Sequence, residues 1–455
     1  MRTHPLRLAL ALLVPGLLLR PALAGELEIG GHVETNHYVG LVYGDLFDYG
    51  NTNVFGLKLQ AQVNPDVVAV GNLELRHRGF TSATTSALLG DRDSVEPLGL
   101  RMQEAYVDLY ALGTEYLDLR VGKQVITWGT ADGMNPTSYL APLDLENPLD
   151  FSTRLGVPAL LATFYFPADL TVSAAVVPVF TPSLLPVDLF AAEMDVPFEL
   201  PDYVELGSQR DRLEFPATQV RSTQVALRLA ANVFDVDLSL SYFYGYQTLP
   251  QLAGIDVYDL DLSQSPWLAH VEASLAYPKT QAIGFDAATS LFGVGLWVEG
   301  AVFLPEELIA EVTLMGDPND PLTGEPLPAI PVISGDPYLK LVAGLDYTLP
   351  GGLYLNLQYL HGFFHELTAE NIQNYALMAL RYSVLDDSLT FELRLGGELH
   401  EGESLGGLAG MEIGWQPSDA VKLTLGGLAA RGDAGTTFDG FSSLDQIYLR
   451  ARADF

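Results

Sequence analysis

The chain has 455 residues, with 57 acidic and 23 basic residues and a formal net charge of −34 at pH 7, which argues against a nucleic-acid-binding surface built on phosphate contacts. It has no cysteine, which excludes disulfides, thiolate metal sites and cysteine nucleophiles. The hydrophobic fraction of 48% is ample for a large folded core.

Residues 1–24 have the features of a secretory signal peptide. A basic start at Arg2 precedes the apolar stretch Leu8–Leu19, which is too short to span a bilayer, and Ala22–Ala24 is an A-x-A cleavage pattern. We expect cleavage after Ala24 and a single mature domain over residues 25–455. An uncleaved N-terminal anchor is the alternative.

Downstream, the longest apolar run is Leu155–Phe166, which is interrupted by Gly156 and Pro158. A transmembrane helix needs about 20 predominantly apolar residues, so the mature chain predicts none. Every backbone polar group in lipid needs an internal partner. A membrane protein without such helices is therefore expected to be a closed β-barrel.

The dominant pattern is strict alternation of apolar and polar residues, as in Leu57–Val63, Leu117–Val121 and Phe391–Leu395. Successive side chains of a strand point to opposite faces, so each segment has one apolar and one polar face. The pattern predicts an all-β transmembrane antiparallel barrel of about 18 strands, an even number as in single-chain bacterial barrels. The predicted strands are 26–43, 53–63, 67–78, 101–111, 116–127, 158–166, 170–178, 219–232, 234–246, 273–291, 294–304, 337–349, 353–362, 374–383, 389–399, 406–416, 421–431 and 444–455.

Tight turns and long loops alternate between these strands. The tight turns are rich in Pro, Gly and Asp and lie at 64–66, 167–169, 350–352 and 417–419. Long connections are predicted at 79–100, 128–157, 179–218, 247–272 and 306–336. Short periplasmic turns and long extracellular loops are typical of outer-membrane barrels. A soluble β-sandwich or propeller is the alternative, although no propeller-like repeat is found.

The last predicted strand ends at Phe455, with Ile447, Leu449 and Ala451 on the same face. A terminal aromatic residue in such a strand resembles the signal read by the β-barrel assembly machinery. That machinery and outer-membrane lipid, including lipopolysaccharide, are the expected partners. Localisation in the outer membrane of a Gram-negative bacterium follows as an expectation.

Charged side chains in the strands are predicted to face the barrel interior, because a cation on the lipid face costs about 2–4 kcal/mol at the membrane midplane. The pore-lining candidates are Lys58, Arg76, Arg78, Arg120, Arg228, Arg381, Arg394, Arg450, Arg452, Glu74 and Glu392. Other inward acids include Glu299 and Glu412. One interpretation is an ion-pair lattice that stiffens the wall. The other is an arginine-lined path for anionic solutes.

No pattern points to an enzyme. His361 and His365 are four residues apart but lie at a predicted strand-to-loop junction, so a metal site is not expected there. No nucleophile elbow, phosphate-binding loop or dinucleotide fingerprint is present. We expect no catalytic residue, no metal and no cofactor.

The segment Gly122-Lys-Gln124-Val-Ile-Thr-Trp128-Gly129-Thr-Ala-Asp132, followed by Asn135-Pro136 and a later Pro142-x-Asp144, carries a family resemblance. It resembles outer-membrane porins related to alginate export and to the polysaccharide-export porins of myxobacteria. The resemblance covers about 30 residues well; Ala141-Pro142 stands where those families usually have Asn-Pro. It implies a channel for a solute or a polysaccharide.

Glycines that permit bends and prolines that stiffen the backbone lie together in the predicted 128–157 loop. Such a loop could fold into the barrel and set its constriction. The candidates are Trp128, Gly129, Asp132, Asn135, Pro136 and Asp144. The alternative is a packed plug with no role in selectivity.

The sequence thus predicts a porin-like channel for hydrophilic solutes, since an 18-stranded barrel is wide enough to hold an aqueous path. A polar small molecule is the expected cargo, with an exported polysaccharide as the alternative within the same class. Two alternatives from other classes are an outer-membrane enzyme and a surface adhesin barrel. Planar-bilayer recording separates a channel from both.

Overall fold

The computed structural model describes residues 25–41, 49–79, 81–83, 85–146, 151–185, 204–261, 267–315, 326–399 and 405–455. The predicted signal peptide lies outside these residues. In this part of the chain, no helix has both the length and the apolar character needed to cross a membrane.

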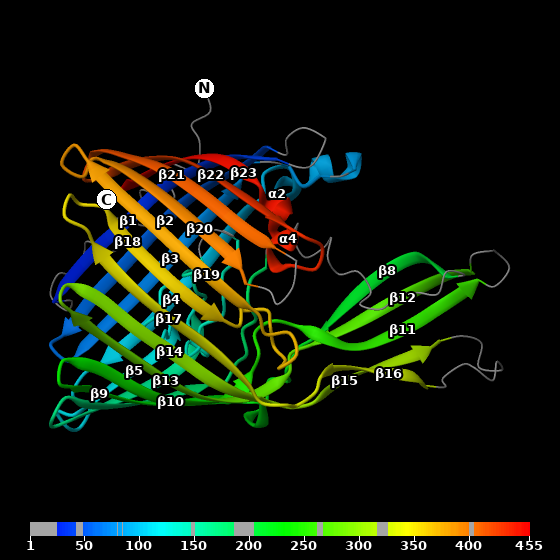
Figure 1. The fold of residues 1–455 in the computed structure, drawn as a ribbon, viewed down its shortest axis with the longest axis horizontal. Helices are drawn as coiled ribbons and strands as arrows, with labels where there is room; N and C mark the ends of the chain where they lie inside the picture. Colours follow the sequence, from blue (N-terminus) through cyan, green and yellow to red (C-terminus); the bar gives the residue numbers. More distant parts are fainter. Residues whose placement is uncertain are drawn as a thin grey trace.

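Eighteen strands form one closed antiparallel sheet (Figure 1). In chain order they are β1 (Glu26–Gly40), β2 (Tyr49–Asn64), β3 (Val67–Arg78), β4 (Leu98–Leu109), β5 (Leu117–Gln124), β6 (Val157–Phe166), β7 (Leu170–Val177), β9 (Gln224–Val233), β10 (Val236–Tyr246), β13 (Lys279–Leu291), β14 (Val294–Pro305), β17 (Tyr338–Thr348), β18 (Tyr354–His361), β19 (Asn374–Val384), β20 (Leu389–Glu398), β21 (Gly406–Ser418), β22 (Val421–Gly432) and β23 (Gln446–Asp454). Each strand pairs with the next barrel strand in the chain. The sheet closes where β1 pairs with β23, with His32 opposite Asp454.

The predicted barrel of 18 strands is confirmed, and each predicted strand overlaps one barrel strand. Two predicted boundaries were wrong. The 219–232 strand begins only at Gln224, because Val220–Ser222 forms a 3-10 turn. The predicted 273–291 strand merges two elements, since residues up to Ala276 belong to a different strand and β13 begins at Lys279.

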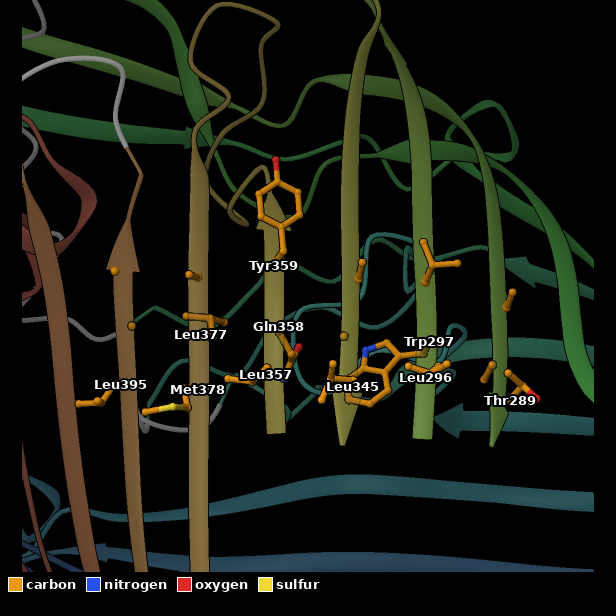
Figure 2. A pocket seen from close by; sticks show the side chains of 18 of the residues that line it. Thr289, Leu296, Trp297, Leu345, Leu357, Gln358, Tyr359, Leu377, Met378 and Leu395 are labelled. Carbon is orange, nitrogen blue, oxygen red and sulfur yellow. The ribbon is translucent and has the colours of Figure 1, made fainter. Parts of the chain in front are cut away.

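Alternation separates the two faces of the barrel wall as predicted. The outward positions are apolar and exposed, including Leu227 and Leu229 on β9 and Leu449 on β23. Figure 2 shows one part of this face, a broad apolar hollow over β13, β14 and β17 to β20. Its outward lining includes Leu296, Leu345, Leu357, Tyr359, Met378 and Leu395.

Short turns join neighbouring strands at one end of the barrel, and the long connections lie at the other end (Figure 1). Several of the tight turns use left-handed backbone, for example at Ala168-Asp169 and at Phe234-Asp235. Two consecutive residues with positive φ give the turn a twist that matches the twist of antiparallel strands.

Five further strands project beyond the barrel from three of the long connections (Figure 1). They are β8 (Val204–Glu214), β11 (Gln251–Asp261), β12 (Trp267–Ala276), β15 (Leu308–Leu314) and β16 (Pro326–Ile333). They form a second sheet in the order β16-β15-β11-β12-β8, packed around Ile255, Val271 and Val312. The predicted long connections at 179–218, 247–272 and 306–336 therefore contain strands that the sequence analysis did not predict, because two of the pairings are parallel contacts between different connections.

Candidate functional site

The connection between β5 and β6 lies inside the barrel, and we call residues 125–156 the inner loop; residues 147–150 of it lie outside the described part. Its apolar residues Ile126, Trp128 and Leu140 pack into one cluster with inward residues of β10, β14 and β17. Around the sheet, β10 is the third strand after β6, and β14 and β17 are the fifth and sixth. The inner loop therefore crosses the barrel interior rather than following its own strands outward.

Glu299 on β14 is the centre of the contact between the inner loop and the far wall. Its carboxylate is fully buried, with 0% exposure. It accepts hydrogen bonds from loop donors, namely the amides of Thr130 (2.8 Å), Ala131 (2.9 Å) and Thr137 (2.8 Å), the Thr137 hydroxyl (2.8 Å) and Asn135 Nδ2 (3.3 Å). Hydrogen bonds to a charged acceptor are the strong ones, and a buried carboxylate needs them to offset its lost hydration.

The backbone at Gly129 lets the inner loop approach this carboxylate closely. Its φ is +97°, and a Cβ added there would lie 2.3 Å from Oε2 of Glu299. Any other residue would thus meet both a strained backbone and a direct clash. The neighbouring Trp128 is buried in the apolar cluster beside it.

Two further side chains tie the inner loop to the same half of the wall. Asp132 Oδ2 accepts a hydrogen bond of 3.0 Å from Asn356 on β18. The ring of Tyr139 stacks on Phe243 of β10, with centroids 5.2 Å apart, and its hydroxyl lies 3.3 Å from Ser241 Oγ. Burial raises the pKa of the Tyr139 hydroxyl, so it stays protonated.

The later part of the inner loop is fixed to the opposite wall by ion pairs. Arg101 on β4 contacts Asp144 at 2.5 Å and Glu146 at 3.0 Å. Arg76 on β3 contacts Glu146 at 2.5 Å. Asp144 has only 3% of its side chain exposed, so its charge depends on Arg101. The loop is therefore anchored on both sides of the interior.

The first residues of the Gly122–Asp132 segment, Gly122 to Gln124, form the end of β5. Gln124 is fully buried, and its Nε2 donates to the carbonyl of Ala159 on β6 at 3.0 Å. Gly122 has φ +132°, and an added Cβ would lie 2.3 Å from the carbonyl oxygen of Ala105 on β4. These residues set the point where the chain leaves the wall and turns inward.

Other long connections also turn inward and meet the inner loop through aromatic rings. Phe151 lies 5.6 Å from Phe363, which follows β18, and 6.5 Å from Phe441, which precedes β23. Beside them, burial lowers the pKa of the His365 imidazole to about 4; Glu366 opposes this shift and Lys340 adds to it.

A small cavity of about 120 Å³ remains between the inner loop and the wall of β10, β13, β14 and β17. Its lining includes Tyr139, Phe303, Arg154 and Lys340. The Lys340 ammonium donates to the carbonyls of Phe363 and Phe364, at 2.5 and 3.3 Å. This volume accommodates only about four water molecules, so the loop is closely packed against this wall.

On the wall of β19 to β23 and β1, three inward arginines keep large exposed fractions. The side chains of Arg381, Arg394 and Arg452 are 53%, 45% and 40% exposed. Arg381 and Arg394 share Glu392, at 2.9 and 2.6 Å. Solvent therefore reaches this side of the interior.

All of the pore-lining candidates lie on the inward face, opposite the exposed apolar residues of their strands. Each arginine among them lies within 4.0 Å of a carboxylate: Arg76 and Arg78 near Glu146, Arg120 near Asp108, Arg228 near Asp286, Arg381 and Arg394 near Glu392, and Arg450 and Arg452 near Glu34. This pairing has the form of the ion-pair lattice. A role in conduction remains a prediction.

The constriction-loop candidates all contact the barrel wall or the small cavity. Hydrogen bonds or ion pairs to wall residues are made by Asp132, Asn135 and Asp144. Packing against wall residues involves Trp128 and Gly129, and Pro136 lines the small cavity. Sequence reasoning missed the partners Arg101 and Glu146 and gave Glu299 no special role. A lone inward carboxylate between Trp297 and Ala301 was the available signal, since such a group needs donors from elsewhere. In the described part of the chain, no group of three or more His, Asp or Glu side chains could hold a metal ion.

Three solved structures share this architecture. Acinetobacter baumannii OccAB4 aligns with a TM-score of 0.50 at 9% identity, covering 96% of this chain and 100% of that one. Pseudomonas aeruginosa OccK2 (OpdF) gives 0.51 at 10% identity, and OccK9 (OpdG) of the same organism gives 0.51 at 9%; each comparison covers 94% of this chain and 98% of the other. At these identities the likeness supports the fold alone.

No protein with a curated description matches the sequence. Residues 43–317, more than half of the chain, match the family described as "Protein of unknown function (DUF1302)". That span contains β2 to β14 together with the whole inner loop and Glu299. The chain therefore belongs to this DUF1302 family.

Proposed function

We propose that the protein is an outer-membrane channel for small hydrophilic solutes, delivered by a cleaved signal peptide of residues 1–24 and inserted by the β-barrel assembly machinery. One observation carries the proposal. The inner loop is anchored on opposite walls of a closed 18-stranded barrel, while the β19 to β23 wall keeps exposed charged side chains. In this proposal hydrated solutes pass along that wall, beside the loop.

In this proposal the inner loop forms the narrowest part of the solute path, and the side of the loop that bears Asp132 faces that path. The arginines of the open wall, Arg381, Arg394 and Arg452, line the half of the barrel nearest the short turns. Their paired carboxylates moderate the charge, so a modest rather than a strong anion preference is expected. A strong cation preference would contradict the arginine-lined path.

Liposome swelling tests the size limit. Vesicles that contain the mature barrel should admit small sugars and amino acids, with rates that fall steeply as the solute grows. Vesicles that carry the same amount of heat-unfolded protein are the control. Equal swelling with both preparations would contradict channel function and favour an adhesin or a plugged barrel.

Export of a polysaccharide, implied by the motif around Trp128 and Asp132, is the second candidate. An inner loop bonded to both walls would have to leave its place to pass a thick polymer. Deletion of residues 128–156 separates the two candidates. A solute channel without the loop should become wider and less selective and should leave the amount of secreted polymer unchanged, whereas in an exporter the deletion should change that amount.

A further inference from the structure

The outward face of β1, β2 and β3 bears a group of polar side chains near the end with the long connections. We call Thr35, His37, Asn51, Asn53 and His77 the outer polar cluster. In the sheet register Thr35 lies opposite Asn53, His37 opposite Asn51, and Asn53 opposite His77. On β1 they continue the face of Val33, which is 51% exposed, so the cluster points away from the barrel interior.

The cluster is a continuous hydrogen-bonded network. The Thr35 hydroxyl donates to Asn53 Oδ1 at 2.8 Å, and Asn53 Nδ2 donates to Asn51 Oδ1 at 2.6 Å. Asn51 Nδ2 lies 3.2 Å from Nδ1 of His37. Asn53 Nδ2 also lies 3.3 Å from Nδ1 of His77. Three strands therefore hold the five side chains together.

The surroundings of the cluster on the outward face are apolar. Val33 precedes the cluster on β1 and lies opposite Phe55, which follows it on β2; Leu98 lies opposite His77, and Leu449 lies opposite His37. Val33, Phe55, Leu98 and Leu449 are all exposed large hydrophobic residues. Polar side chains on the lipid face are costly to a barrel, and such groups mark function more often than packing.

We propose that the outer polar cluster binds the phosphate-bearing headgroup of an outer-leaflet lipid. The amide, imidazole and hydroxyl donors of the cluster bond to one another here, and some of them would turn to a bound phosphate; the cluster has no carboxylate to repel an anion. The flanking apolar side chains offer a surface for the acyl chains of the same molecule. This proposal depends on the transmembrane position of the barrel and is independent of channel activity.

A hydrolytic site is the competing interpretation, because Thr35, His37 and Asn51 have the order of nucleophile, base and orienting group. The geometry favours binding instead. The Thr35 hydroxyl lies 3.3 Å from Nε2 of His37 but donates over 2.8 Å to Asn53. The proton that a base would remove is thus directed elsewhere.

Native mass spectrometry of the detergent-solubilised mature barrel tests the proposal. The probes are lipopolysaccharide, the same lipopolysaccharide after enzymatic removal of its phosphates, and phosphatidylglycerol. We expect retention of lipopolysaccharide, and a loss of about tenfold when its phosphates are removed. If phosphatidylglycerol is retained equally, the cluster binds lipid phosphate in general. If phosphatidylglycerol is not retained, the cluster binds the phosphorylated glycolipid.

The variant H37L/H77L should reduce retention by about tenfold, because it removes two hydrogen-bonding groups. The matched control is Gln281→Leu, an outward polar residue at the same end of the barrel that bonds to Tyr242. Folding of each variant is checked by the shift in gel mobility on heating. Unchanged retention in folded H37L/H77L, retention without phosphate, or release of fatty acid by the wild type would overturn the proposal.

Discussion

At the scale of single residues, the path of the inner loop depends on one buried carboxylate. Glu299 has 0% exposure and is surrounded by donors from Thr130, Ala131 and Thr137. A buried charge with its donors in place is tolerated, whereas one partner without the other destabilises by about 3–5 kcal/mol. Changes at this position should therefore act on the loop and leave the sheet intact.

Glu299→Gln is the first prediction. The variant loses the charge and turns an NH₂ group toward the amides of the loop, so the contact should weaken by about 3 kcal/mol. Single channels should show larger and noisier conductance. Asp237→Asn, which changes a carboxylate at the short-turn end of β10 that accepts a hydrogen bond from Asn232, is the control and should conduct like the wild type. Identical traces from Glu299→Gln and the wild type would contradict the anchoring role.

Gly129→Ala is the second prediction, since its Cβ would meet Oε2 of Glu299 at 2.3 Å on a backbone with φ +97°. Proteolysis within the inner loop should become several-fold faster. Gly113→Ala is the matched control, because Gly113 also has a positive φ, of +71°, but an added Cβ finds open space. Equal protease resistance in the two variants would argue against the close approach.

The third prediction concerns pH and His365. Its pKa of about 4 in the folded protein is below the free value of about 6.5, so the folded loop favours the neutral ring. Above pH 7 the ring is neutral in both the folded and the unfolded chain, so its burial costs no stability through ionisation. As the pH falls from 6.5 toward 4, packing of residues 362–373 should weaken by up to about 3 kcal/mol. Hydrogen exchange at Phe363 and Tyr375 measures this, and His365→Gln should remove most of the pH dependence.

At the scale of elements, the barrel strands can be predicted because one face of each strand meets lipid and the other meets the interior. Apolar and polar residues therefore alternate along the strand. Leu57–Val63 lies within β2, where that pattern is complete. The projecting strands also alternate in part, as in Ala310–Leu314, but nothing local in the sequence indicates that β11 pairs in parallel with β15 from another connection. The donors to Glu299 likewise lie far away in the sequence, so the motif around Trp128 signals an ordered loop but not its anchor.

The ion pairs at the second anchor give an element-scale prediction. Arg101→Ala should leave Asp144 buried without its partner and release the end of the inner loop, at a cost of about 3–5 kcal/mol. Faster hydrogen exchange at residues 144–146 would report it. Arg381→Ala is the control, because a half-exposed ion pair contributes less than about 1 kcal/mol. Similar exchange in both variants would contradict the anchor.

At the scale of the whole molecule, the barrel closes by backbone pairing of β1 with β23, which leaves no open sheet edge in the wall. The projecting sheet is a separate set of hydrogen-bonded strands. Interior contacts are tightly packed around Glu299, whereas Arg381, Arg394 and Arg452 on β19, β20 and β23 stay partly exposed. This asymmetry is what a selective passage through a wide barrel needs.

Planar-bilayer recording of the mature protein tests that claim most directly. The wild type should give discrete, stable conductance steps, and the variant without residues 128–156 should give larger ones of lower ion selectivity. If neither protein conducts while both show the heat-dependent gel shift of a folded barrel, the interior is a plug and the channel interpretation is wrong.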